Sequence, residues 1–145
     1  TEIGYNYRMS NVLAAIGVAQ MEVIEERIER TRELNQIYRK EVGNLFYSFQ
    51  EERETDRSNM WLTCALMKGE DRPEDLIKHL ADDNIEARRI WKPMHEQPVM
   101  QDYKKYINGN SSLLFLQGIC LPSGSDLTNK DMKRIIKSIK TFFKK

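Results

Sequence analysis

A crowded set of side chains that can bind ligands lies between residues 88 and 98. This stretch, RRIWKPMHEQP, holds two arginines, a lysine, an indole, a histidine and an amide, and two prolines stiffen its backbone. Such groups can stack on a ring, pair with phosphates and hydrogen-bond to sugar hydroxyls. A lone histidine is often a structural residue, so the residue types leave a binding loop and a structural loop both open.

The segment 4–11, GYNYRMSN, precedes a helical pattern and has the groups to bind an anion. Asn6 offers an amide donor and Arg8 a guanidinium. Both lie beside a helix N-terminus, where free N–H groups and the helix dipole favour negative charge. A phosphate would suit these donors. The alternative is a capping segment with two exposed tyrosines, which the residue types alone favour.

A third segment, residues 118–128, ends a strand in a Pro-Ser-Gly turn and leads into a capped helix, so a structural role is sufficient for it. Cys120 and His95 could form a nucleophile and base, but a thiol within Ile-Cys-Leu-Pro is expected to be buried and inert. The two histidines and the two cysteines are far apart in the sequence, so no metal-ligand spacing is present. Dinucleotide, P-loop and nucleophile-elbow motifs are absent from the sequence.

Composition narrows the class of protein. The 145 residues are 40% hydrophobic and 31% charged, which suits one globular domain and excludes a disordered tail. The 23 basic and 22 acidic side chains nearly cancel, so we expect no nucleic-acid partner. No apolar run approaches the ~20 residues of a membrane span, so we expect no membrane partner. The N-terminus has no signal-peptide pattern and no Met, which suggests a truncated chain. Two free thiols favour a cytoplasmic protein.

The sequence predicts one long helix directly after the possible anion-binding segment. Apolar residues at steps of three and four predict a helix over residues 10–42, with Ser10 as its N-cap and Gly43 at its end. Small residues occupy nearly every face of its first half, so we expect that half to pack against a partner element. The second half is densely charged and has one apolar seam.

The remaining elements predict an α+β fold. After the long N-terminal helix, we expect a small, mostly antiparallel sheet of three or four strands that helices cover on one face. The strand at 60–67 is apolar on both faces. The expected elements are a strand at 60–67, a helix at 73–83, a strand at 85–90, a helix at 111–117 capped by Ser111, a strand at 119–121, and a final helix capped by Thr128 or Asn129.

Together, the three segments resemble a known family. Residues 4–11, followed by Ala14-Ala15-Ile16-Gly17 and Gln20-Met21-Glu22, are similar to the GxNxRM and AAxGxxQLE signature of the DegT/DnrJ/EryC1/StrS sugar aminotransferases. The runs 91–98 (WKPMHEQP) and 120–124 (CLPSG) resemble the branch that acts on 4-keto UDP-amino sugars. The resemblance covers nearly the whole chain, and its motifs occur in the expected order.

This resemblance implies a fold-type I aminotransferase that uses pyridoxal 5'-phosphate (PLP) and works as a homodimer. Asn6 would reach the PLP phosphate of the partner subunit, and Arg8 is a candidate for the same anion. The candidate contacts to the sugar nucleotide are Trp91, Lys92, His95 and Gln97. Two residues depart from the family pattern, since Arg89 stands where proline is expected and Glu96 where an uncharged residue is expected.

The family's catalytic lysine lies upstream of its GxNxRM motif, so we expect none of the catalytic residues in this chain. The resemblance therefore implies the C-terminal small domain, residues 1–145, of an enzyme that transfers an amino group, from glutamate, to a 4-keto nucleotide sugar. Within it we expect an interface and phosphate loop at 1–9, the helix at 10–42 and an α+β subdomain at 59–145. The alternative is a non-catalytic α+β module for binding or dimerisation.

Overall fold

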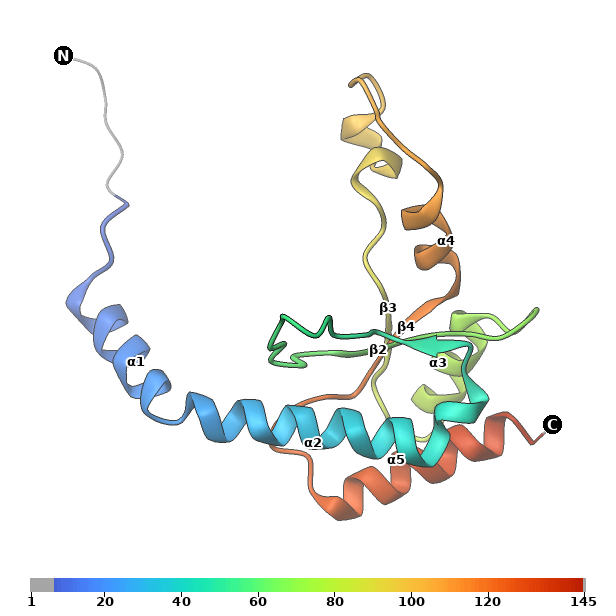
Figure 1. Ribbon diagram of the computed structural model, residues 1–145, viewed down its shortest axis with the longest axis horizontal. Coiled ribbons are helices and arrows are strands. Elements are labelled where there is room, and N and C mark those ends of the chain that lie inside the picture. The colour runs from blue at the N-terminus through green and yellow to red at the C-terminus, as the bar shows by residue number, and fades with distance from the viewer. Residues whose placement is uncertain (1–6, 145) are drawn as a thin grey trace.

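The computed structural model describes residues 7–144. Two helices come first and a four-stranded sheet with three further helices follows (Figure 1). The elements are α1 (Asn11–Glu22), α2 (Ile24–Val42), η1 (Gly43–Leu45), β1 (Ser48–Phe49), β2 (Thr63–Leu66), α3 (Pro73–Asp82), β3 (Arg88–Arg89), η2 (Met94–Glu96), η3 (Pro98–Met100), α4 (Asn110–Gln117), β4 (Gly118–Leu121) and α5 (Asn129–Phe142).

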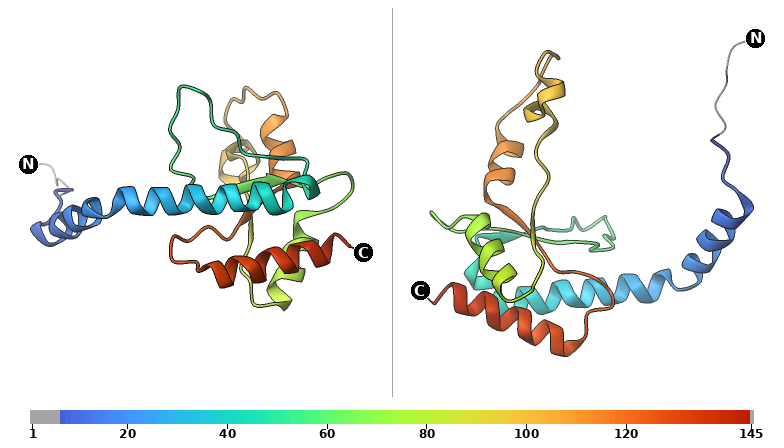
Figure 2. Two further views of the ribbon diagram at one scale, coloured as in Figure 1. Left: turned by 60° about the horizontal axis from the view of Figure 1, so that its bottom comes forward. Right: turned by 180° about the vertical axis from the view of Figure 1, so that it is seen from behind.

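The helix expected over residues 10–42 is two helices, and this corrects the prediction of one continuous element. The chain leaves helical geometry at Val23, whose φ is −114° and whose ψ is 5°. Its N–H bonds to the carbonyl of Gln20, three residues back. Val23 and Ile24 are both β-branched, and such side chains crowd the preceding helical turn. Figure 2 shows α1 leading away from the rest of the chain beyond this break.

The sheet confirms the predicted α+β fold. Its strand order is β1-β2-β4-β3, and every neighbouring pair is antiparallel. The last strand in the sequence, β4, therefore lies between β2 and β3. Thr63 pairs with Leu121 and Leu66 with Gly118 along the central pair.

Helices α2, α3 and α5 cover one face of this sheet, as the sequence predicted. Burial alternates along β2, because Thr63 and Ala65 are buried while Cys64 and Leu66 are half-buried. The strand predicted at 60–67 therefore buries one face fully and the other in part, and its paired residues are Thr63–Leu66. The helices contribute the rest of the core, whose fully buried side chains include Leu34, Tyr38, Leu76, Leu80, Ile119, Ile135 and Ile139.

Local capping signals place the ends of the helices. Thr128 caps α5 in a capping box, in which its hydroxyl accepts from the N–H of Asp131 and the Asp131 carboxylate accepts from the N–H of Thr128. Pro73 occupies the first turn of α3, where its missing N–H is tolerated. Helix α4 begins one residue before the predicted cap Ser111, because Gly109 takes the left-handed conformation, with φ of 84°.

The segment between β3 and α4 projects from the sheet together with α4 (Figure 1). It contains the two short helices η2 and η3, and none of the residues of α4 is buried. The strand predicted at 85–90 pairs only at Arg88 and Arg89 before this projection begins. Across residues 7–144, no helix has both the length and the apolar character needed to cross a membrane.

Candidate functional site

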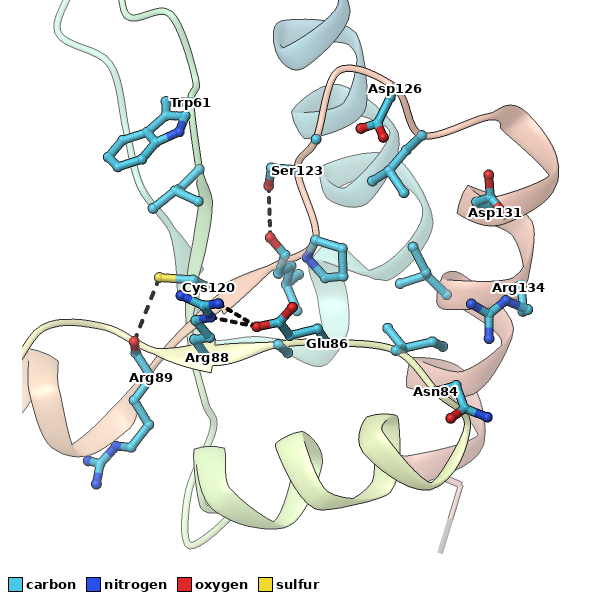
Figure 3. A pocket seen from close by; sticks show the side chains of 18 of the residues that line it. Trp61, Asn84, Glu86, Arg88, Arg89, Cys120, Ser123, Asp126, Asp131 and Arg134 are labelled. Carbon is cyan, nitrogen blue, oxygen red and sulfur yellow. Dashed lines mark hydrogen bonds and ion pairs between the residues drawn. The ribbon is translucent and has the colours of Figure 1, made fainter.

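A cavity of about 600 Å³ lies where β3, β4 and the start of α5 meet. One wall comes from Trp61 and Leu62, just before β2, and from the residues on either side of β3. The other wall comes from the turn between β4 and α5 (Figure 3). Its lining is mostly apolar, with a few charged side chains around it. Cavities of this size and character suit a small-molecule ligand.

Two tryptophans lie side by side in the lining of this cavity. The ring centroids of Trp61 and Trp91 lie 6.2 Å apart at an interplanar angle of 36°. Both side chains are largely exposed, at 66% and 68%. Exposed indoles so close together can contact a flat ring or the apolar face of a sugar.

Several charged side chains around the cavity already have partners. Arg88 forms an ion pair of 2.5 Å with Glu86, and Arg134 donates to the carbonyl of Asp83 at 2.6 Å. Hydrogen bonds from the hydroxyl and the N–H of Thr128 hold the pKa of Asp131 below its usual range.

The four residues predicted to contact the sugar nucleotide fall into two groups. Trp91 lines the cavity, whereas Lys92, His95 and Gln97 lie along the projecting segment outside it. The Gln97 amide donates to the Lys92 carbonyl at 3.4 Å, which closes this turn. The predicted loop is therefore divided between the cavity, which Trp91 lines, and the projecting segment, which carries the other three residues.

His95 has a defined setting in this segment. Its Nε2 lies 3.2 Å from the hydroxyl of Ser112 on α4 and 3.7 Å from the carboxylate of Glu96. The Ser112 hydroxyl donates to the same carboxylate at 2.5 Å. Glu96, which departs from the family pattern, therefore helps to fix the imidazole against α4.

Arg89 is a structural residue. It forms an ion pair with Glu74 on α3, donates to the Phe115 carbonyl at 2.5 Å, and stacks its guanidinium 4.0 Å from the centre of the Phe115 ring. This arginine ties α3, β3 and α4 together, and it also lines the cavity.

The predicted cofactor-binding segment is described only in part. Asn6 lies outside the described residues. Arg8 is exposed two residues before Ser10, whose hydroxyl caps α1 by accepting from the N–H of Leu13 at 3.3 Å. The first turn of α1 contains no acidic residue. A guanidinium beside a helix N-terminus is suited to an anion.

The third segment has the structural role expected from the sequence. Ser123 is buried, and its hydroxyl accepts from the N–H of Thr63 and donates to the carbonyl of Leu121, both at 2.8 Å. This residue closes the end of the β2–β4 pair. Among the described residues, no group of three or more His, Cys, Asp and Glu side chains is placed to hold a metal ion.

Sequence reasoning missed Trp61 as a site residue because it lies in an apolar run that predicts a strand. Met60 has a positive φ of 47°, so the strand begins only at Thr63. Trp61 is left at the strand entry, next to Trp91. The available signal in the sequence was a second tryptophan 30 positions before Trp91.

Comparisons with known proteins agree with this architecture. The model of the DegT/DnrJ/EryC1/StrS aminotransferase family matches residues 1–140. EpsN of Bacillus subtilis (strain 168), whose name includes the words pyridoxal phosphate-dependent aminotransferase, is 40% identical over 148 residues, which cover 99% of this chain and 38% of that protein. A GDP-perosamine synthase of Escherichia coli O157:H7 is 37% identical and covers 97% of this chain and 38% of its own length.

A solved structure shows the same fold. The DegT DnrJ EryC1 StrS aminotransferase from Brucella abortus superposes with a TM-score of 0.86 at 22% identity, over 100% of this chain and 39% of that chain. The chain therefore belongs to the DegT/DnrJ/EryC1/StrS aminotransferase family, which is PLP-dependent, and corresponds to a C-terminal part of it. It spans about two fifths of the length of these relatives.

Proposed function

We propose that this chain is the C-terminal part of an enzyme that transfers an amino group, from glutamate, to a 4-keto nucleotide sugar. The observation that carries the proposal is the family match over residues 1–140, and the cavity with two exposed indoles supports it. Relatives named GDP-perosamine synthase support a nucleotide-sugar substrate. The catalytic lysine would lie upstream, in a part of the enzyme that this chain does not include.

Each part of the chain has a role in this proposal. PLP, when bound, carries the amino group between donor and acceptor. Asn6 and Arg8 would bind its phosphate, and Asn6 would do so across a subunit interface. Trp91, with Trp61, would orient the substrate by contact with a ring. Lys92, His95 and Gln97 would bind its phosphates and hydroxyls along the projecting segment.

The assembly that we propose is a homodimer in the cytoplasm. None of the twelve residues of α1 is buried, although Val12, Leu13 and Ile16 are apolar and more than half exposed. A helix with this much exposed apolar surface needs a partner. Both cysteines are free thiols, which suits a reducing compartment.

The experiment that tests the proposal separates the two half-reactions of the full-length enzyme. His95→Ala should lower kcat/KM for the 4-keto sugar nucleotide by about tenfold, which corresponds to the loss of one hydrogen bond of ~1.4 kcal/mol. The half-reaction with glutamate should be nearly unchanged, because glutamate does not need this segment. Stopped-flow absorbance of the cofactor measures each half-reaction.

Glu96→Gln is the matched control, because it weakens the contact that fixes the imidazole while keeping His95 itself. It should give a smaller loss in the sugar half-reaction alone. Equal damage to both half-reactions by His95→Ala would show that His95 supports the fold or the cofactor. In that case the sugar nucleotide is bound elsewhere.

A further inference from the structure

Two cysteines face each other across the centre of the sheet. Cys64 on β2 is the direct partner of Cys120 on β4, and their sulfur atoms lie 3.7 Å apart. They are 56 positions apart in the sequence, so only the fold brings them together. Both are free thiols in this structure.

The register favours a bond between them. The N–H of Met67 donates to the carbonyl of Gln117, so these residues form a hydrogen-bonded pair. Hydrogen-bonded and non-hydrogen-bonded pairs alternate along an antiparallel ladder, which makes Cys64 and Cys120 a non-hydrogen-bonded pair. The Cα atoms of such pairs lie about 4.5 Å apart, within the range that a disulfide spans. Oxidation would therefore need little movement of the backbone.

The pair lies on the face of the sheet that α2, α3 and α5 do not cover. Thr63 and Ala65, which flank Cys64 on β2, point into the core. Cys64 is half-buried, while Cys120 is only 7% exposed and lines the cavity described above. A reagent in solution therefore reaches Cys64 first.

The two thiols also differ in acidity. The hydrogen bond between the two sulfur atoms lowers the pKa of the Cys64 thiol below its usual value. The same bond and burial raise the pKa of Cys120. Thiolates are the reactive form of cysteine, so Cys64 is the attacking group and Cys120 responds afterwards.

We propose that Cys64 and Cys120 form an oxidisable dithiol site that reacts with small-molecule disulfides. The Cys64 thiolate attacks one sulfur of the reagent, forms a mixed disulfide and releases one reduced thiolate. Cys120 then loses its proton to solvent and attacks the Cys64 sulfur, which releases the second thiolate. The protein loses two protons and two electrons, and the disulfide reagent gains them as two thiols. This inference does not depend on the proposed aminotransferase function.

Oxidation should alter the wall of the cavity. The sulfur atoms would approach from 3.7 Å to about 2.05 Å, and the Cys120 sulfur would be drawn toward β2. The Cys120 thiol now lies 4.0 Å from the carbonyl of Arg89 on β3, as the dashed line in Figure 3 marks. That contact loses its S–H donor when the disulfide forms.

The test treats the full chain with oxidised glutathione, blocks the remaining thiols with iodoacetamide, and measures intact and peptide masses. Wild type should lose both alkylatable thiols and about 2 Da, because disulfide formation removes two hydrogen atoms. Peptide mapping should join the segments that contain Cys64 and Cys120, and dithiothreitol should restore both thiols.

Single variants test the order of the two steps. Cys120→Ala should stop at a mixed disulfide of glutathione with Cys64. Cys64→Ala should leave Cys120 reacting at least about tenfold more slowly, because that thiol is buried and burial by itself still raises its pKa. The rates of the two variants should converge in denaturant, where both thiols are exposed.

The thiol and mass measurements on the wild-type chain test the proposal even if a variant fails to fold. Two retained thiols, stable mixed disulfides at both positions, or a disulfide between two chains would each overturn it. Equal rates for the two folded variants would overturn the assigned order of attack.

Discussion

Helices α1 and α5 are similar in length, at 12 and 14 residues, but only one of them packs in this chain. Five residues of α5 are buried, and its charged residues lie on the opposite face. No residue of α1 is buried, although α1 is the more apolar of the two helices. Ile139 on α5 is fully buried, whereas Ile16 on α1 is 54% exposed.

This contrast shows that the arrangement of apolar residues matters more than their number. A helix with one apolar stripe can bury that stripe on its own sheet and leave its polar face in water. A helix that is apolar on all sides needs neighbours on several sides, and residues 7–144 supply none to α1. The small residues of α1 suit close contact with other backbones, as the sequence predicted.

The largest expected effect comes from Ile139→Ala. This substitution should lower the free energy of unfolding by about 2–5 kcal/mol, because it leaves a cavity in a packed core. Ile16→Ala is the matched control in α1 and should change it by less than ~0.5 kcal/mol, as exposed sites do. Urea denaturation of the chain measures both. Equal losses would show that α1 is packed in the chain, which would remove the contrast.

A second prediction concerns α1 in the full-length enzyme. Ile16→Asn should weaken the assembly by about 1–3 kcal/mol there, because an amide would be buried at the interface without a partner. The same change should leave the stability of the present chain nearly unaltered. Analytical ultracentrifugation over a concentration series measures the dimer, and Ile16→Leu serves as the conservative control. An unaltered dissociation constant for Ile16→Asn would place α1 outside the interface.

Removing the helix cap should also lower the free energy of unfolding more for α5 than for α1. Thr128→Ala removes the capping box of α5 and should destabilise the chain by about 1 kcal/mol. Ser10→Ala removes the equivalent hydrogen bond of α1, but it should change global unfolding by less than ~0.5 kcal/mol, since α1 can fray alone. Thermal and urea denaturation measure the global effect, and amide hydrogen exchange detects the fraying. A larger effect of Ser10→Ala would contradict this ranking.

The smallest effect is a pH dependence confined to α5. The pKa of Asp131 is lowered in the folded chain, chiefly by the Thr128 hydroxyl. Its contribution to stability is therefore fully present above the unfolded value of ~3.9 and is lost as pH falls through the folded pKa. The stability difference between wild type and Asp131→Asn should shrink below about pH 4. The effect of Ser10→Ala should not change over this range, because the first turn of α1 has no acidic residue.

Strong local signals made most of the fold predictable from the sequence. The apolar stripe of α5 predicted its buried face, and the two candidate caps Thr128 and Asn129 predicted its start to within one residue. The break at Val23 was not predicted, because the apolar pattern continues through it with only a small shift. Strand β1 was missed because its two residues make too short a pattern to recognise. Such features depend on tertiary packing, which a local pattern does not contain.

The candidate site was predictable only in part. Trp91 and His95 stand out in the sequence because ligand-type residues crowd around them. Their separation into a cavity residue and a residue fixed against α4 required the fold. Trp61 lies in a run that predicts a strand. It comes close to Trp91 only because β4 pairs with β2 on one side and with β3 on the other. The contact between Cys64 and Cys120 depends on that same register.

The central place of β4 has a consequence for synthesis on the ribosome. The chain emerges from its N-terminus, so β1, β2 and β3 all leave the exit tunnel before β4 does. Until Gly118 to Leu121 appear, β2 has only its partner β1, and β3 has no strand to join among the described residues. The unpaired edge of β2 is open to other chains during this interval. A nascent chain that stalls while Gly118 to Leu121 are still inside the exit tunnel would thus be more exposed to aggregation than one that stalls after they have emerged.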